Sequence, residues 1–242
     1  MAVIEIKKLD FSYVENQMVL KHIDLSIEKN EKVGLIGSNG VGKSTLLKIL
    51  VGILSTDESS ISVCDMSLNK KNLKEIRRQV GYIFQDSDSQ LFMPTVYADV
   101  SFGAKNYGYS NEEVKIRTMN ALKQVQLDGI SDKQIYHLSG GEKKLVSIAG
   151  ILTLDPQIIL MDEPSASLDP KNRRNLIQIL NDLDCAYFIA SHDLDFIYDT
   201  CDRVILLHHG QIVADGNTKE VLKNKELLEQ CDLELPLRFQ EW

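Results

Sequence analysis

Residues 37–45 combine the residue types that bind the phosphates of a nucleotide. Their sequence, GSNGVGKST, fits the pattern G-x-x-x-x-G-K-[ST] of phosphate-binding loops. Glycines let successive backbone N–H groups approach phosphate oxygens, Lys43 adds a compact positive charge, and the Ser44 hydroxyl suits Mg²⁺. We therefore expect phosphate contacts from the whole loop: Gly37, Ser38, Asn39, Gly40, Val41, Gly42, Lys43, Ser44 and Thr45.

The elements on either side of this loop agree with that interpretation. An apolar stretch at 32–36 predicts a strand before it, and the stretch 44–50 has the periodicity of a helix. A helix that begins at the loop favours anions at its N-terminus. A plain glycine-rich turn would match the same letters, but it would not need this strand and this helix.

Three other apolar runs end in polar residues that suit the same chemistry. Gln85 follows one run, the pair Asp162-Glu163 follows a second, and His192 follows a third. Where the chain turns at the end of a strand, two adjacent carboxylates can serve one site, one holding Mg²⁺ and the other polarising a water. Sites in parallel α/β sheets gather at the carboxyl ends of strands, so we expect these residues and the phosphate loop to meet.

Two further stretches are weaker signals. In Leu138-Ser139-Gly140-Gly141-Glu142, Ser139 can cap the helix that follows, and the glycines expose backbone N–H groups to an anion. Ser-Gly-Gly also occurs in many ordinary turns. Tyr13 lies just outside the first predicted strand, where an aromatic ring either stacks on adenine or packs half-buried; its position upstream of the phosphate loop favours stacking.

Alternating apolar and polar residues predict a strand pair at 3–9 and 18–28. Strands then alternate with helices, which predicts a largely parallel α/β sheet. Residues 96–127 have helical periodicity with a break near 108–111, so this stretch is expected to form an inserted helical lobe. Further elements are expected at 60–63 (strand), 171–183 (helix), 194–200 (helix), 203–208 and 211–215 (strands) and after Gly216 (helix).

The composition narrows the class of protein. The chain has 242 residues, of which 43% are hydrophobic and 26% charged, as in ordinary globular domains. The net charge of −8 argues against nucleic acid as a partner. We expect no membrane span and no secretory signal, and the scattered positions of the four cysteines favour reduced thiols over a zinc site.

These motifs, in this order, resemble the ATP-binding subunit of ABC transporters. The resemblance covers residues 3–216 and rests most specifically on the Leu-Ser-Gly-Gly element between Gln85 and the paired acids. It implies an α/β fold of the P-loop NTPase class, with a mixed sheet, an antiparallel β subdomain and an inserted helical subdomain. The implied division of the single domain 1–242 is a RecA-like core with the β subdomain at 1–84 and 155–216, a helical subdomain at about 86–153, and a C-terminal tail at 217–242.

The resemblance also implies roles for individual residues in binding and hydrolysing ATP. Tyr13 stacks on adenine, residues 37–45 including Lys43 hold the phosphates, and Ser44, Gln85 and Asp162 surround Mg²⁺. Glu163 is the general base and His192 holds the γ-phosphate. The resemblance further implies a head-to-tail dimer with a second ATPase subunit, which is either the same chain or a paralogue. In this dimer the ATP of the second subunit is contacted by Ser139, Gly140 and Gly141. Asp169 lies in the loop that links the two sites.

Glu142 departs from the family, in which a glutamine usually follows Leu-Ser-Gly-Gly. A carboxylate aimed at a triphosphate would repel it, whereas an acid at a helix N-terminus is favourable by a few tenths to about 1 kcal/mol. We expect Glu142 to point away from the phosphates and the site to remain active.

The segment 84–103 looks like that of the energy-coupling factor importers, and so does Gly141-Glu142-Lys143-Lys144. In that group the segment faces a transmembrane coupling protein, and a small membrane protein binds the substrate. The short C-terminus and Ser191-His192-Asp193 favour the cobalt or nickel branch over the vitamin branch. The resemblance thus implies a peripheral ATPase at the cytoplasmic face of the cell membrane. The alternative is another ABC transporter ATPase. Soluble members of the family that act on ribosomes or DNA fit the sequence less well, and so does a binding module that does not hydrolyse ATP.

Overall fold

The computed structural model describes residues 1–15, 17–56 and 60–240 and contains two sheets. A six-stranded sheet has the order β10-β9-β3-β8-β7-β6, parallel except for β10, which pairs antiparallel with β9. A four-stranded antiparallel sheet has the order β2-β1-β4-β5. The strands are β1 Ala2–Ser12, β2 Met18–Glu28, β3 Lys32–Ile36, β4 Ser60–Val63, β5 Met66–Ser67, β6 Val80–Ile83, β7 Ile158–Asp162, β8 Ala186–Ala190, β9 Arg203–His208 and β10 Gln211–Asn217.

The central strands of the large sheet are buried on both faces. Every residue of β7 and β8 is buried, and successive residues point to opposite sides. Ile159 and Tyr187 join one hydrophobic core, whereas Leu160 and Phe188 join the other. The near-continuous apolar runs of the sequence therefore reflect a sheet that is covered on both faces.

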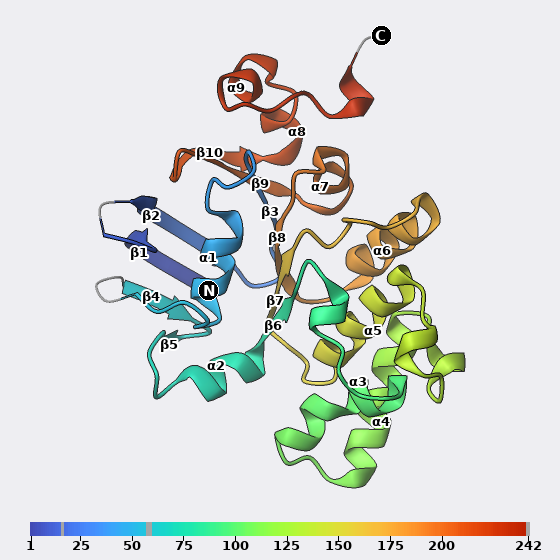
Figure 1. Cartoon of the computed structure of the whole chain (residues 1–242). Helices are drawn as coiled ribbons and strands as arrows, with labels where there is room; N and C mark the ends of the chain where they lie inside the picture. The colour runs from blue at the N-terminus through green and yellow to red at the C-terminus, as the bar shows by residue number, and fades with distance from the viewer. Residues whose placement is uncertain (16, 57–59, 241–242) are drawn as a thin grey trace.

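The helices divide between these two faces (Figure 1). Helix α1 packs between the two sheets, whereas α5, α6 and α7 contribute to the core on the other face of the large sheet. The described helices are α1 Lys43–Leu50, α2 Leu73–Gln79, α3 Val96–Asn106, α4 Asn111–Gln124, α5 Gly140–Leu152, α6 Pro170–Asp182, α7 Leu194–Thr200, α8 Thr218–Val221 and α9 Lys225–Gln230, with 3₁₀ turns η1 Ser87–Ser89, η2 Asp128–Ile130, η3 Ile135–His137 and η4 Leu237–Phe239.

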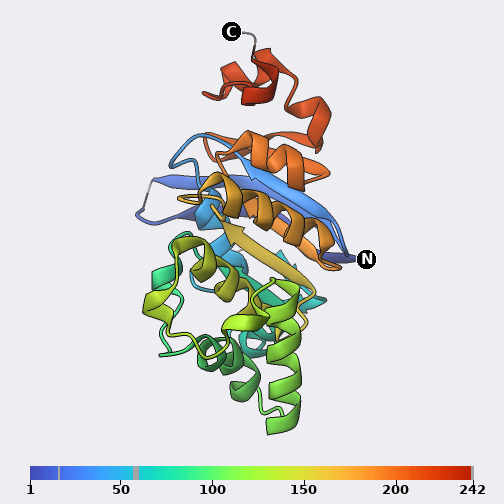
Figure 2. The same ribbon diagram turned by 90° about the vertical axis from the view of Figure 1, so that its right-hand side faces the viewer.

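Helices α3, α4 and α5 pack on one another at one end of the molecule, as both ribbon views show (Figures 1 and 2). The expected break between α3 and α4 is confirmed. Gly108 adopts a φ of 81°, and Ser110 then caps α4 through a capping box with Glu113. This turn reverses the chain, so α4 can pack back on α3.

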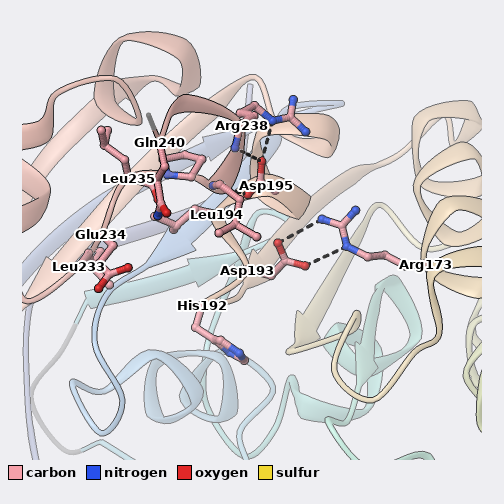
Figure 3. A pocket seen from close by; sticks show the side chains of 12 residues that line it. Arg173, His192, Asp193, Leu194, Asp195, Leu233, Glu234, Leu235, Arg238 and Gln240 are labelled. Atoms are coloured by element: carbon pink, nitrogen blue, oxygen red, sulfur yellow. Dashed lines mark hydrogen bonds and ion pairs between the residues drawn. The ribbon is translucent and has the colours of Figure 1, made fainter. Parts of the chain in front are cut away.

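The C-terminal tail docks on the body of the molecule, at helix α7. Arg238 forms ion pairs of 2.7 Å with both Asp195 and Asp199, and its guanidinium lies 4.3 Å from the Tyr198 ring centroid. The Leu237 N–H donates to Asp195 at 2.7 Å. The tail, described as far as Gln240, is thereby fastened to the helix that begins just after His192 and Asp193 (Figure 3).

Candidate active site

The phosphate loop follows β3 and depends on glycine at its two ends. Gly37 has a φ of 151°, and a Cβ there would lie 2.3 Å from the Leu207 carbonyl oxygen. Gly42 has a φ of 114° and occupies the N-cap position of α1. The buried Lys43 ammonium donates to the carbonyl oxygens of Gly37 at 2.7 Å and Ser38 at 3.1 Å. Burial lowers the pKa of Lys43, opposed by Glu163 and Asp162.

The paired acids diverge because the backbone turns between them. Asp162 ends β7 and accepts a 2.8 Å hydrogen bond from the Ser44 hydroxyl on α1. Glu163 has a left-handed φ of 47°, and its N–H donates to the Ala190 carbonyl oxygen at 2.8 Å. Burial raises the pKa of Asp162, and the neighbouring Glu163 adds to the rise while the Ser44 hydrogen bond opposes it. One acid therefore serves the phosphate loop and the other faces the end of β8.

Glu163 is held by the residues that follow β8. Its carboxylate accepts hydrogen bonds from the Ser191 hydroxyl at 3.1 Å and the His192 N–H at 3.1 Å. The His192 ring Nδ1 lies 2.9 Å from Glu163 Oε2. The Glu163 side chain is 9% exposed, whereas the His192 side chain is 60% exposed. A buried, oriented carboxylate beside an accessible imidazole has the arrangement that general-base chemistry needs.

A second set of contacts fixes the segment around His192. Asp193 caps α7 by accepting from the Phe196 N–H at 2.8 Å, and Arg173 of α6 donates to both its carboxylate oxygens at 2.9 and 3.1 Å (Figure 3). Burial by itself would raise the pKa of Asp193, but the hydrogen bonds from Arg173 and Phe196 hold it below its ordinary value. The loop that contains His192 is thus joined to α6.

Tyr13 contacts the phosphate loop, whereas Gln85 contacts helix α5. The Tyr13 hydroxyl is 2.9 Å from Thr45 Oγ1. The residue is 57% exposed, and its ring packs edge-on against Phe11 with the ring centroids 5.0 Å apart. Gln85 is exposed, and its backbone carbonyl accepts a hydrogen bond from Lys144 of α5. Burial lowers the pKa of Lys144 to about 8, opposed by Asp86 and Asp162.

Ser139 caps α5 as the sequence predicts, and Glu142 completes a capping box. The Ser139 Oγ accepts from the Glu142 N–H at 3.3 Å, and Glu142 Oε2 accepts from the Ser139 N–H at 2.7 Å. Glu142 Oε1 lies 2.9 Å from the Lys133 ammonium, and the Ser139 N–H is the main cause that lowers the pKa of Glu142. The carboxylate that departs from the family pattern therefore has local partners for its charge.

The structure brings together only part of the expected set. Contacts join the phosphate loop, Asp162, Glu163 and His192, and Tyr13 joins them through Thr45. Ser139, Gly140, Gly141 and Asp169 lie instead at the N-termini of α5 and α6, on the other face of the large sheet from α1 (Figure 1).

Sequence reasoning assigned no role to Ser191, Asn172 or Lys144. Ser191 stood beside the predicted histidine, and its position at the end of a strand was a usable signal. Asn172 packs against Gly141, where a Cβ would lie 2.4 Å from its side chain, and donates to Asp169 at 2.6 Å. Lys144 donates to the Gln85 backbone carbonyl. Nothing in the local sequence pattern indicated that Asn172 would pack on Gly141 or that Lys144 would reach Gln85.

The residues present fit a nucleotide bound with Mg²⁺. Magnesium prefers oxygen ligands, and Ser44 Oγ and Asp162 Oδ1 lie side by side at the start of α1. The Lys43 ammonium donates to backbone carbonyl oxygens, which are uncharged acceptors. The charged oxygens of a phosphate can therefore replace them. The loop also opens a helix whose N-terminus favours negative charge.

The fold and this cluster define a nucleotide hydrolase of the P-loop class. A sequence model of the ABC transporter family matches residues 20–166, more than half of the chain. The chain belongs to the ABC transporter family, as an ATP-hydrolysing subunit.

Relatives and solved structures agree with this assignment. The chain is 40% identical, over 97% of its length, to the energy-coupling factor transporter ATP-binding protein EcfA2 of Methanospirillum hungatei, of which it spans 60%. It is also 40% identical to EcfA of Methanocaldococcus jannaschii, with 98% of this chain and 86% of that protein covered.

Two solved structures have the same fold over nearly their whole length. CbiO1 of Clostridium perfringens, described as part of the ABC transporter complex cbiONQ, matches with a TM-score of 0.86 and 35% identity, covering 95% of this chain and 94% of the other. A nucleotide-free ATP-binding cassette matches with a TM-score of 0.83 and 26% identity, covering 95% and 98%. In the ranges that the structure describes, none of the helices has the length and apolar content needed to cross a bilayer.

Proposed function

We propose that this chain is the ATPase of an energy-coupling factor importer that takes up cobalt or nickel ions through membrane partners. The similarity to EcfA proteins supports the energy-coupling factor type, and the similarity to CbiO1 of a cbiONQ complex supports an ATPase of a multi-subunit ABC transporter. The choice of the cobalt or nickel branch rests on the sequence resemblance at Ser191-His192-Asp193. A vitamin importer of the same type, or another ABC transporter, is the alternative. In each case the cargo crosses the membrane without touching this chain, which works at the cytoplasmic face of the cell membrane.

The contact of Glu163 with Ser191 and His192, beside the Ser44–Asp162 pair, is the observation that supports hydrolysis most directly. Glu163 takes a proton from the attacking water while the water oxygen forms a bond to the γ-phosphorus. The bond between the γ-phosphorus and the bridging oxygen breaks, and ADP leaves with that oxygen. Lys43 leaves the carbonyl oxygens of Gly37 and Ser38 for the phosphate oxygens. Ser44, Asp162 and the Gln85 side chain would hold Mg²⁺, which would supply neutralisation of the phosphate charge.

The separation of the two anion-binding elements supports a head-to-tail dimer. The phosphate loop lies at the start of α1 on one face of the large sheet, and Ser139 lies at the start of α5 on the other side. The exposed N-terminus of α5 can therefore complete the ATP site of a second subunit. Asp169, at the start of α6, would lie close to the same interface, because Asn172 joins Asp169 to the position beside Gly141.

A groove beside the helical lobe supports a membrane partner. The groove, of about 410 Å³, lies between β6, α2, α3 and α5, and its walls include Arg77, Tyr82, Ile151 and Leu154. Phe102 precedes Gly103 of the groove wall and packs edge-on against Phe92, with the ring centroids 4.8 Å apart. Phe92 is 65% exposed. An apolar surface rimmed by arginine suits a helix of the transmembrane coupling protein.

Copurification tests the importer proposal. We would tag the full-length chain in its native cell, extract membranes in mild detergent and identify the bound proteins. We expect one coupling protein, one small substrate-binding membrane protein and either no second ATPase, indicating a homodimer, or a paralogue. A chain recovered with ribosomes, or in the soluble fraction alone, would contradict the importer and leave the ATPase assignment intact.

A further inference from the structure

Lys144 is a buried cation whose partners are two backbone carbonyls of another segment. It lies in the first turns of α5, five residues after the cap Ser139, and is 2% exposed. Its ammonium donates to the carbonyl oxygen of Phe84 at 2.8 Å and to that of Gln85 at 2.9 Å. Burying an ammonium is unfavourable unless hydrogen bonds compensate for lost water, so these two bonds are a specific feature of the fold.

The segment that accepts these bonds is tied down at further points. The Phe84 N–H donates to Gln90 Oε1 at 3.1 Å, so both backbone polar groups of Phe84 are engaged. The adjacent lysine of α5, Lys143, reaches Asp88 in η1 with its ammonium 2.5 Å from Oδ1. Two consecutive residues of α5 therefore hold the segment 84–90, one through buried backbone bonds and one through an exposed ion pair.

We propose that Lys144 is a positioning residue that makes Gln85 and the helix opened by Ser139 move as one unit. This inference rests on the proposed role of Gln85 at the Mg²⁺ of the bound nucleotide. Because Lys144 holds the carbonyl oxygens of Phe84 and Gln85, which lie on either side of the Gln85 Cα, any shift of α5 is passed directly to the backbone that presents the Gln85 side chain. Rigid shifts of packed helices are a common way for a distant contact to reach a site.

The chemistry of this link distinguishes it from simple packing. A methionine fills about the same space as lysine but donates no hydrogen bond, so Lys144→Met removes the link while keeping the volume. Arginine keeps the charge and several donors, so Lys144→Arg retains the link. Lys143→Met changes charge by the same amount on the same helix, but its partner Asp88 is 69% exposed, so little should change.

The test is a double-mutant cycle on the full-length chain, with kcat, the KM for MgATP and the Mg²⁺ concentration for half-maximal activity as readouts. We expect Lys144→Met and Gln85→Ala each to lower kcat by about 10- to 100-fold, because misplacement of a site by about 1 Å has effects of that size. The double variant should be no slower than Gln85→Ala alone, since both changes remove the same function. Lys143→Met and Lys144→Arg should keep kcat within about threefold.

Thermal unfolding of each variant checks the fold. Additive losses in the double variant, or equal losses in Lys144→Arg and Lys144→Met with both folded, would overturn the inference. Normal kcat in Lys144→Met beside an impaired Gln85→Ala would also overturn it while leaving the proposed Mg²⁺ site in place. Normal kcat in Gln85→Ala would instead remove Gln85 from that site.

Discussion

At the scale of single residues, the site depends on one backbone angle. The left-handed φ of Glu163 turns its carboxylate toward Ser191 and His192, while Asp162 stays on the Ser44 hydroxyl. In a regular strand, neighbouring side chains would point to opposite faces of the sheet. The turn at the end of β7 is therefore the reason that adjacent acids can have separate tasks within one site.

Replacing Glu163 by glutamine tests the task proposed for it. The amide keeps the size of the side chain and its carbonyl can still accept from Ser191, but it cannot take a proton. We expect phosphate release to fall by about 100-fold or more, with ATP binding retained. Glu31→Gln is the matched control, because Glu31 is a half-buried carboxylate paired with Arg203 at 2.9 Å, away from the site. Wild-type turnover in Glu163→Gln would remove it from the role of base.

At the scale of elements, helices α5 and α6 are joined where both begin. Asp169 caps α6 by accepting from the N–H groups of Lys171 and Asn172, and the Asn172 side chain packs against Gly141 of α5. The tail contributes a comparable fastening on α7, through Arg238. The cap residues at the N-termini of α5, α6 and α7 are Ser139, Asp169 and Asp193. Side chains of neighbouring elements therefore hold these three helix ends in place.

Two adjacent glycines allow a controlled test of the α5–α6 contact. A Cβ on Gly141 would lie 2.4 Å from the Asn172 side chain, whereas a Cβ on Gly140 would meet nothing within 4 Å. We expect Gly141→Ala to lower the free energy of unfolding by about 1–3 kcal/mol through overpacking. Gly140→Ala should be neutral, or stabilising by up to about 1 kcal/mol, because alanine favours helix. Denaturant unfolding measures both, and equal effects would contradict the close packing.

At the scale of the whole molecule, the two elements that we propose bind ATP, the phosphate loop and the start of α5, lie on different faces of the large sheet. The phosphate loop is contacted by Asp162 of its own chain, whereas Ser139 is exposed at the start of α5. A head-to-tail pair would use both elements of both chains, and would couple closure of the dimer to the groove beside the helical lobe.

Mixing two inactive variants tests this arrangement. Lys43→Ala removes the cation of the phosphate loop, and Ser139→Asp keeps a good helix cap but adds a charge that repels phosphate. Each variant alone should be nearly inactive, because both sites of its dimer are damaged. An equal mixture should recover activity, up to about a quarter of wild type, because mixed dimers contain one intact site. Steady-state phosphate release measures the recovery, and a mixture no more active than its parents would argue against shared sites.

The local patterns of the sequence were enough to predict the strand and helix on either side of the glycine-rich loop, the polar residues at the ends of the strands and most element boundaries. The alternation of apolar residues in 3–9 and 18–28 predicted the antiparallel pair of β1 and β2, and the break near Gly108 divided α3 from α4. These features depend on neighbours in the chain, where periodicity, caps and glycine angles act within a few residues.

The contacts between distant segments were decided only by the tertiary structure. Lys144 reaches Phe84 and Gln85 across about 60 residues of chain, Asn172 packs on Gly141, and the tail docks on α7 by Arg238. In the sequence Lys144 is one charge among several, because nothing local separates a buried lysine from an exposed one. Which charge becomes buried depends on how the helical lobe packs against β6, and that is a property of the whole fold.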